Sequence, residues 1–309
     1  MYLNRGSKNV IFSILLKLIR QYEQDSAKRF GLNLRYRFEF FVRTTTRQKK
    51  NMTNKNRIQN QTAVVTGATS GIGQACAFAL AEQGVNLILM ARRAERLAAL
   101  KDELSQYPVT VETYVLDVRE LDKINEVFAD VDAKHKVDIL INNAGLALGL
   151  GNIDEGRIEQ WEQMIDTNIK GLLYVSRAVI PKMREQNSGH IVNIGSMAGG
   201  ITYPGGNVYC ASKSAVHTLS EAMNLDLVGT NIRVSNVAPG AANTEFSKVR
   251  FDGNETQADA VYEGFTPLGA EDIADLIVYI LNAPAHVNIQ HTLVMPTAQR
   301  SPTVLHRDQ

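Results

Sequence analysis

Short apolar segments rich in β-branched residues alternate with helical segments along most of this chain. Seven of the apolar segments have the length and composition of strands, at residues 62–66, 85–90, 110–116, 137–141, 190–194, 232–238 and 289–295. Segments between them, such as residues 93–105 (RAERLAALKDELS) and 121–134, repeat apolar residues with the period of an α-helix. Parallel strands need long crossover connections, and helices supply these on both faces of a sheet. The sequence therefore predicts an α/β fold in which a doubly wound parallel sheet of about seven strands forms a single domain.

Charge is distributed unevenly between two parts of the chain. Residues 1–51 contain twelve Lys and Arg but three Asp and Glu, a net charge of +9, whereas residues 52–309 carry −8. The near-neutral total of +1 argues against binding to nucleic acid through bulk charge. We expect residues 1–51 to be a basic leader, either a disordered appendage or an upstream extension of a protein that starts at Met52, and residues 52–309 to be the folded domain. An organelle presequence or a membrane-surface helix is the alternative for such a leader, but we do not expect it to contact a membrane.

The sequence shows no feature of a spanning, secreted or metal-binding protein. Its nearest approach to a membrane span is the apolar run at residues 10–19, which contains Lys17, whereas a span needs about 20 apolar residues. No small-residue cleavage site follows that run, so we expect a cytoplasmic location. Two cysteines far apart, Cys76 and Cys210, exclude a disulfide framework, and the six histidines show no paired spacing, so no metal site is predicted.

A glycine-rich turn joins the first predicted strand to a helix predicted over residues 74–82. Its sequence, TGATSGIG at residues 66–73, allows a tight turn and lets a pyrophosphate approach backbone N–H groups at the start of the helix. A tight turn without a ligand is the alternative, but the placement between strand and helix favours dinucleotide binding. The candidate cofactor residues of this turn are Gly67, Thr69, Ser70, Gly71, Ile72 and Gly73.

The end of the second predicted strand distinguishes NAD from NADP. A carboxylate at this point binds the ribose 2′-hydroxyl and repels a 2′-phosphate. Residues 90–93 (MARR) contain no acid, and the guanidinium groups of Arg92 and Arg93 suit a phosphate through charge-assisted hydrogen bonds. The alternative is two solvated arginines at a helix start, where the helix dipole disfavours cations. The sequence therefore predicts NADP as the cofactor.

Further candidates follow later strands, at the edge of the sheet where ligands of doubly wound folds bind. Asp117 and Val118 come after the third strand, and Asn143 belongs to the segment NNAG that comes after the fourth. These residue types are also favoured in plain caps and turns. Their shared place at the carboxyl edge makes them candidates for cofactor binding.

A serine, a tyrosine and a lysine form the candidate catalytic group. Ser196 follows the fifth strand, and Tyr209 and Lys213 are four residues apart, so that they lie on one face of a helix. The ordinary tyrosine pKa of about 10 is too high for efficient proton transfer near neutrality. A neighbouring ammonium lowers that pKa, and Lys213 is placed to do so, aided by the positive ring of an oxidised nicotinamide. Tyr/Lys pairs also occur as plain surface residues, but together with the glycine-rich turn the functional interpretation is preferred.

These motifs resemble those of the short-chain dehydrogenase/reductase family, and the resemblance covers residues 52–309. The family's TGxxxGxG, NNAG and YxxxK motifs match residues 66–73, 142–145 and 209–213. The resemblance implies a Rossmann-like fold, an oxidoreductase and hydride transfer between nicotinamide C4 and a carbinol or carbonyl carbon. It also implies a homotetramer.

The resemblance also implies a role for each site residue. Tyr209 would be the general acid/base, and Ser196 would hold the substrate oxygen by a hydrogen bond. Lys213 would bind the nicotinamide ribose, and Asn168 would hold a water that links Lys213 to solvent, although a helix-kink residue is the alternative for Asn168. The remaining residues carried over as nicotinamide-binding are Pro239, Gly240 and Thr244.

Residues 243–251 and 284–289 resemble those of NADP-dependent 3-hydroxy acid dehydrogenases. The resemblance implies a small serine-like, threonine-like or 3-hydroxypropionate-like substrate, or its semialdehyde. Because such substrates carry a carboxylate, we expect a cation in the site, and Arg250 is the candidate; a solvated arginine is the alternative. A 3-oxoacyl thioester reductase is a second interpretation, but these enzymes usually end in a VDGG-like strand where this chain has TLVMPT. A dinucleotide-sensing regulator is the non-enzymatic alternative, which the complete Ser/Tyr/Lys set disfavours.

Overall fold

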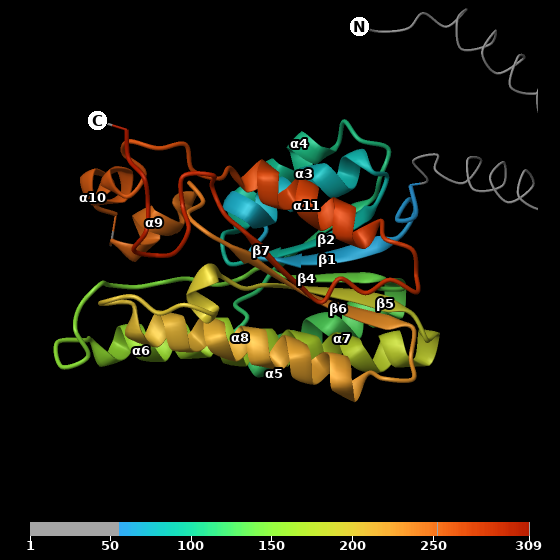
Figure 1. Ribbon diagram of the computed structural model, residues 1–309. Helices are drawn as coiled ribbons and strands as arrows, with labels where there is room; N and C mark the ends of the chain where they lie inside the picture. Colours follow the sequence, from blue (N-terminus) through green and yellow to red (C-terminus); the bar gives the residue numbers. More distant parts are fainter. Residues whose placement is uncertain (1–55, 252, 309) are drawn as a thin grey trace, which may run out of the picture. The chain divides into compact units, whose positions relative to one another are not determined.

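The computed structural model describes residues 56–251 and 253–308 (Figure 1). The predicted leader, residues 1–51, and the boundary at Met52 lie outside the described residues. Within the described part, a sheet lies between two layers of helices, as expected for a doubly wound fold (Figure 1).

The sheet has seven parallel strands in the order β3-β2-β1-β4-β5-β6-β7. The chain therefore runs outward in one direction from β1 and then in the other from β4. Ligands of such sheets bind at this switch point, beyond the carboxyl ends of the strands. The strands are β1 (Thr62–Thr66), β2 (Asn86–Ala91), β3 (Val111–Val115), β4 (Ile139–Asn142), β5 (Gly189–Ile194), β6 (Ile232–Pro239) and β7 (His291–Val294).

Helices cover both faces of the sheet, and each layer has its own apolar core. Neighbouring strand residues point to opposite faces, so Val64 joins one cluster of buried side chains and Val65 joins the other. In Figure 1, one layer consists of α3 (Gly71–Glu82), α4 (Ala94–Leu104) and α11 (Ala270–Leu281). The other consists of α5 (Leu121–Lys134), α6 (Ile158–Ile165), α7 (Leu172–Gln186) and α8 (Asn207–Asp226).

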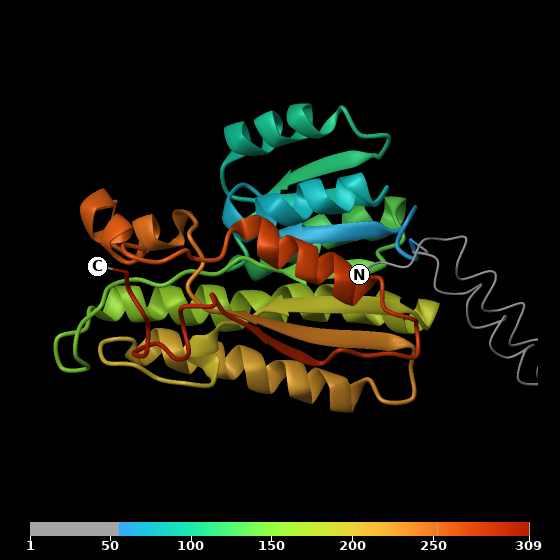
Figure 2. The ribbon, with the colours of Figure 1, turned by 45° about the horizontal axis from the view of Figure 1, so that its top comes forward.

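Two short helices and the C-terminal segment lie beyond the carboxyl edge of the sheet (Figure 2). They are α9 (Glu245–Arg250) and α10 (Glu255–Ala260), which follow β6. Two further irregular turns adjoin this edge: the π-helix η1 (Asp166–Gly171), between α6 and α7, and the 3₁₀-helix η2 (Met197–Gly199), after β5. The connections at the carboxyl edge, rather than the sheet itself, shape the site.

The predicted fold is confirmed, and the differences lie at the ends of elements. The bounds of β1 and α5 agree with the prediction. Strand β7 is shorter than predicted: it covers His291–Val294 and not the whole apolar run at residues 289–295. Only His291–Val294 pairs with β6, and apolarity alone does not mark where pairing stops. Helix α3 begins at Gly71, inside the glycine-rich turn, because that residue turns the chain directly into the helix with φ of +52°.

Among the described residues, no helix has both the length and the apolarity that crossing a membrane requires. In the same part of the chain, no group of three or more His, Cys, Asp or Glu side chains is placed to hold a metal ion. Cys76 and Cys210 are both buried and free.

Candidate active site

A pocket of about 470 Å³ opens at the carboxyl edge of the sheet, within the range of volumes usual for ligand sites. Most of the residues proposed from the sequence line it. These are Gly67, Thr69, Ser70, Gly71, Ile72, Arg92, Arg93, Asp117, Val118, Asn143, Ser196, Tyr209, Lys213, Pro239, Gly240, Thr244 and Arg250. Two proposed residues, Gly73 and Asn168, do not line the pocket.

The glycine-rich turn forms one wall of the pocket. Gly67 has φ of +64°, in the left-handed region that favours glycine. A Cβ atom on Gly73 would lie 2.4 Å from both the Gly67 carbonyl oxygen and Asn143 Nδ2, so no side chain fits there. Gly73 therefore serves the close packing of the turn rather than direct contact with a ligand.

Asn143 braces this turn from β4, and helix α3 begins behind it. Its Nδ2 donates to the carbonyl oxygens of Thr66, at 3.0 Å, and Gly67, at 3.1 Å. Ser70, the residue before α3, makes no side-chain capping hydrogen bond with the first N–H groups of the helix. Those N–H groups and the positive end of the helix dipole suit the pyrophosphate of a dinucleotide.

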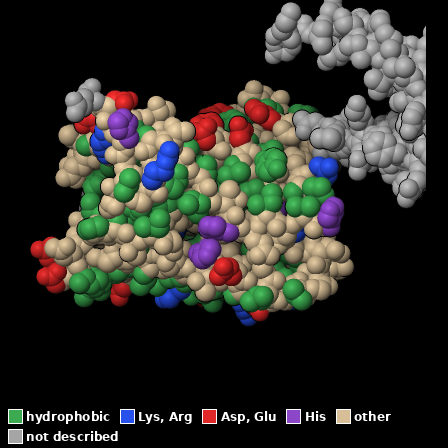
Figure 3. All heavy atoms as spheres, in the orientation of Figure 1, with side chains coloured by type: hydrophobic (Ala, Val, Ile, Leu, Met, Phe, Trp, Pro, Cys, Tyr) green, Lys and Arg blue, Asp and Glu red, His purple; other side chains and the backbone are tan. Residues whose placement is uncertain are grey.

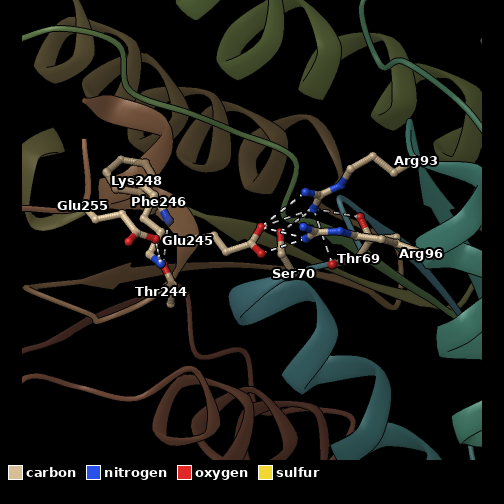
Figure 4. Close-up of polar contacts among 9 residues, drawn as sticks. All are labelled: Thr69, Ser70, Arg93, Arg96, Thr244, Glu245, Phe246, Lys248 and Glu255. Atoms are coloured by element: carbon tan, nitrogen blue, oxygen red, sulfur yellow. Dashed lines mark hydrogen bonds and ion pairs between the residues drawn. The ribbon is translucent and has the colours of Figure 1, made fainter. Parts of the chain in front are cut away.

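The arginine end of the pocket differs from what the sequence suggested. Arg93 Nη2 donates to Ser70 Oγ at 3.1 Å and Thr69 Oγ1 at 3.2 Å, which ties it to the glycine-rich turn. Residues 90–93 contain no acid, but the fold brings Glu245 from α9 to within 3.3 Å of Arg93 and 2.7 Å of Arg96 (Figure 4). We expected no carboxylate next to these arginines. The structure corrects this expectation, because Glu245 is distant in the sequence but lies beside Arg93 in the fold.

Asp117 also lines the pocket, where it pairs with Arg119 and is affected by the charge of Arg92. Burial opposes ionisation of its carboxyl, but hydrogen bonds from Arg119 outweigh that effect and hold the pKa of Asp117 below its usual range. The ion pair between Arg119 Nη2 and Asp117 Oδ2 measures 2.6 Å. Asp117 therefore stays ionised at the pocket wall near neutral pH.

Ser196, Tyr209 and Lys213 meet at the opposite wall. Ser196 directly precedes η2, where its Oγ accepts from the Ala198 N–H at 3.1 Å, and it lines the pocket together with Tyr209. Tyr209 and Lys213 project from α8 and are 8% and 6% exposed. The Nζ of Lys213 donates to the carbonyl oxygen of Ile194, the last residue of β5, at 2.8 Å.

Burial dominates the protonation of this pair. It raises the pKa of Tyr209 well above the ordinary value of 10.0, although the hydrogen bond with Ser196 offsets part of the rise. The pKa of Lys213 falls to about 8, because its charged form loses hydration in the interior. Burial sets the direction of both shifts, and the lowering of the Tyr209 pKa by Lys213 together with an oxidised nicotinamide remains a prediction.

Asn168 supports the pocket from behind. It lies in the π-helix η1, 2% exposed, and its Oδ1 accepts from the Leu146 N–H at 2.8 Å. Its Nδ2 donates to the Leu146 carbonyl at 2.8 Å and to Ser212 Oγ at 3.0 Å. The amide thus holds Leu146, which lines the pocket. A water held by Asn168 remains a prediction.

Arg250, at the end of α9, places a cation beside the tyrosine. Its guanidinium lies 5.8 Å from the centre of the Tyr209 ring and 5.5 Å from that of Tyr203, and its Nε donates to the Gly149 carbonyl at 3.3 Å. Its Nη2 is buried and makes no hydrogen bond with any described residue. The alternative of a solvated arginine is therefore not what the structure shows.

Among the pocket residues that were not proposed from the sequence, three contact proposed residues through a ring or a charge. Phe246 packs against Tyr209 with 5.5 Å between ring centres, and Tyr203 lies under Arg250. Glu245 also lines the pocket, beside the arginines. Glu245 and Phe246 directly follow the proposed Thr244 in the sequence, and this proximity could have identified them as pocket residues. The sequence of the loop around Tyr203 contains no motif that could have done so.

Comparisons with known proteins show which family the chain resembles. A model of the family described as short chain dehydrogenase matches residues 61–255. The chain is 48% identical over 238 residues to the NADP-dependent 3-hydroxy acid dehydrogenase YdfG of Salmonella typhi, with 76% of this chain and 95% of that protein covered. It is also 48% identical over 238 residues to sulfoacetaldehyde reductase 2 of Chromohalobacter salexigens, with 76% of this chain and 94% of that protein covered.

The same similarity extends to a solved structure. The closed form of serine dehydrogenase complexed with NADP⁺ superposes with a TM-score of 0.75 and 43% sequence identity, and the match covers 81% of this chain and 100% of that chain. The sequence similarity, the fold and the residues around the pocket lead to one conclusion. The chain belongs to the short-chain dehydrogenase family, as its motifs predicted.

Proposed function

We propose that this oxidoreductase uses NADP(H) to interconvert a short-chain 3-hydroxy acid and its semialdehyde. The buried, unpartnered Nη2 of Arg250 carries the proposal, because it offers hydrogen-bond capacity and positive charge to a substrate anion next to Tyr209. A small carboxylate fits this arrangement. Relatives named for a 3-hydroxy acid and for sulfoacetaldehyde point to the same chemistry, since both compounds are short and anionic.

The residues around the pocket fit NADP. The glycine-rich turn and the start of α3 suit the pyrophosphate, and Arg92 and Arg93 suit a 2′-phosphate. When bound, NADP⁺ supplies the hydride acceptor at nicotinamide C4, so that the carbinol is oxidised to a carbonyl as NADP⁺ becomes NADPH. A relative whose structure contains NADP⁺ supports the assignment.

Tyr209 moves the proton in this scheme. In reduction, its phenol donates a proton to the oxygen of the forming hydroxyl, and burial keeps the phenol protonated for this step. In oxidation, the phenolate accepts that proton back. Ser196 would hold the reacting oxygen by a hydrogen bond, since it lines the same pocket as Tyr209 and its interaction with Tyr209 favours the phenolate. Lys213 would hold the nicotinamide ribose and stabilise the phenolate when it is charged.

A comparison of anionic substrates with an uncharged one tests the proposal. We expect NADP⁺-dependent oxidation of 3-hydroxypropionate and serine with a much higher kcat/KM than that of the uncharged methyl ester of 3-hydroxypropionate. Replacing Arg250→Gln should raise KM for the acid at least tenfold, because a charge-assisted hydrogen bond is worth about 1.5–3 kcal/mol. The KM for the ester should stay unchanged.

Lys248→Gln is the matched control, because Lys248 lies on the same helix but pairs at the surface with Glu255, at 2.8 Å. That variant should behave as wild type. Equal use of the acid and the ester by the wild-type protein would contradict the proposal. Efficient NADPH-dependent reduction of 3-oxoacyl thioesters, with no turnover of free acids, would favour the thioester alternative instead.

We also propose a cytoplasmic homotetramer, on the basis of the family resemblance. The outermost strand β7 and helix α11 carry exposed apolar side chains, with Leu293 49% and Tyr279 70% exposed, and Figure 3 shows hydrophobic side chains gathered on this face. Such surface suits contact with another copy. Sedimentation equilibrium should give the mass of four chains, and a monomer mass would contradict this. Cell fractionation tests the location.

A further inference from the structure

A carboxylate links the two ends of the pocket. Glu245, the first residue of α9, forms ion pairs with Arg93 at 3.3 Å and with Arg96 at 2.7 Å (Figure 4). Both arginines belong to the start of α4, on the cofactor side. The last residue of α9 is Arg250, on the substrate side. A helix of fewer than two turns thus connects the proposed phosphate site with the proposed substrate anion site.

The two arginines hold Glu245 in different ways. Arg96 Nη1 contacts both carboxylate oxygens, at 2.7 Å and 3.0 Å. Arg93 makes longer contacts with Oε2, at 3.3 Å and 3.4 Å, and also donates to Thr69 and Ser70 in the glycine-rich turn. Arg93 is therefore shared between α9 and the cofactor side, whereas the contacts of Arg96 go to Glu245.

The helix transmits a displacement from one end to the other because it is short. From its first to its last residue, α9 spans roughly 8 Å at 1.5 Å per residue. Phe246, next to Glu245, packs on Tyr209, and Arg250 at the far end lies over the same ring. A shift at Glu245 therefore moves both side chains that face Tyr209 from α9.

We propose that Glu245 is a positioning residue: by its ion pairs with Arg96 and Arg93 it holds α9 over the pocket and so places Arg250 for the substrate anion. The inference rests on the proposed function for the roles of Arg250 and of the arginines at the 2′-phosphate. It has a distinctive consequence, because Glu245 competes with the phosphate for Arg93 while it organises the substrate end.

Glu245→Gln should therefore affect substrate and cofactor differently: it should weaken use of the hydroxy acid without weakening the binding of NADP⁺. The KM for 3-hydroxypropionate should rise roughly three- to tenfold, the size expected for the loss of two half-exposed ion pairs, with kcat changed less than twofold. The dissociation constant of NADP⁺, measured by calorimetry, should stay the same or fall, because Arg93 is released and a negative charge is gone. Simple damage to the pocket would weaken both.

A readout without ligands follows the position of α9 itself. Trp161, the single tryptophan of the chain, packs on the same apolar cluster as Phe246. In the ligand-free protein, Glu245→Gln should shift Trp161 emission to longer wavelength, because displacement of Phe246 admits water to that cluster. Glu255→Gln is the matched control: it removes an exposed ion pair with Lys248 on α9 but none with α4, and should leave emission and both affinities unchanged.

The reciprocal exchange of charge completes the test. Arg96→Glu alone and Glu245→Arg alone should each raise KM for the acid, and the double variant should restore it to within twofold of wild type. A wild-type KM in Glu245→Gln, a KM and an NADP⁺ dissociation constant that rise together, or a double variant no better than the singles would each overturn the proposal. A shift in Trp161 emission with unchanged KM would also overturn it, since α9 would then move without consequence for Arg250.

The same measurements distinguish a failure of the proposed function from a failure of the positioning role. If no hydroxy acid is turned over by the wild-type protein, the proposed substrate is wrong, and Trp161 emission and NADP⁺ binding still report on the ion pairs of Glu245. If the wild-type protein oxidises the acids but Glu245→Gln matches it in every measurement, the function stands and the positioning role is wrong.

Discussion

Burial decides the chemistry of the side chains at the centre of this site. Tyr209 and Lys213 are both almost completely enclosed, and each is driven toward its neutral form. A neutral phenol is a proton donor, which suits reduction of a carbonyl. For oxidation, positive charge must accumulate near the phenolate, and Arg250 at 5.8 Å from the ring of Tyr209 is one source of it.

Removal of the phenol oxygen tests its role in proton transfer. Tyr209→Phe should lower kcat by about 10²–10⁴-fold, on the order of 3–5 kcal/mol in the barrier, because one acid/base group is lost. NADP⁺ binding, measured by calorimetry, should change little, since the ring and its packing remain. The control is Tyr107→Phe, which removes a surface hydrogen bond with Glu82 outside the pocket and should match wild type. Activity of Tyr209→Phe within a few-fold of wild type would contradict the role.

Arg92 and Arg93 set the expected preference for NADP. Replacing both by Ala should raise KM for NADP⁺ tenfold or more and KM for NAD⁺ little, because one charge-assisted hydrogen bond is worth about 1.5–3 kcal/mol. Added salt should narrow the wild-type preference, since the side chain of Arg93 is 43% exposed. Steady-state kinetics with both cofactors measures this. A wild-type protein with equal or better kcat/KM for NAD⁺ would show that the arginines do not select the phosphate.

At the scale of the elements, adjacent strands are joined by contacts between polar side chains as well as by the backbone hydrogen bonds of the sheet. His190 of β5 and Ser235 of β6 are buried, and Nε2 of the histidine lies 2.8 Å from the serine Oγ. Burial, together with the positive charge of Arg233, lowers the pKa of His190 from 6.5 to about 3. The ring is therefore held neutral, because its protonated form would place a positive charge in the interior near Arg233.

The pH dependence of unfolding follows from that shift. Between pH 6.5 and 3 the unfolded chain binds a proton at His190 that the folded protein excludes, so stability is present above pH 6.5 and is lost as pH falls through this window. From pH 7 to 5 the loss due to His190 should be about 2 kcal/mol in the free energy of unfolding. Urea titrations of His190→Gln should show this much less loss than wild type. His306→Gln, at a side chain that is 80% exposed, is the control and should show the wild-type loss.

For the whole molecule, the break in charge near Met52 separates two kinds of polypeptide. The described residues begin at Asn56 and already contain every strand of the sheet and every residue of the pocket. Residues 1–51 carry no motif proposed for binding or catalysis. The leader is therefore proposed to be dispensable for folding and turnover.

A chain that begins at Met52 tests this directly. It should be soluble, unfold at the same temperature as the full chain within a few degrees, and retain its kcat/KM, because the sheet and the pocket form from later residues. Circular dichroism melting and steady-state kinetics measure both. An insoluble or inactive truncated chain would show that the leader belongs to the fold.

The order of the elements and the motifs at the strand ends followed from the sequence alone. Local signals carry this information: a period of two or 3.6 marks the element, and glycine spacing marks the turn that receives a pyrophosphate. Tyr209 and Lys213 share a helix face for the same reason, since a spacing of four residues is a property of the helix itself.

Only the tertiary structure decided which side chains meet across the pocket and how they are protonated. Glu245 reaches Arg93 over a separation of 152 residues, and no local pattern encodes that pairing. Gly73 and Asn168 carry family motifs but lie behind the pocket wall, because packing, not sequence, sets which face a residue presents. The burial that raises the pKa of Tyr209 is likewise a property of the tertiary structure. Spacing places a lysine near a tyrosine, but the loss of water around both depends on everything packed against them.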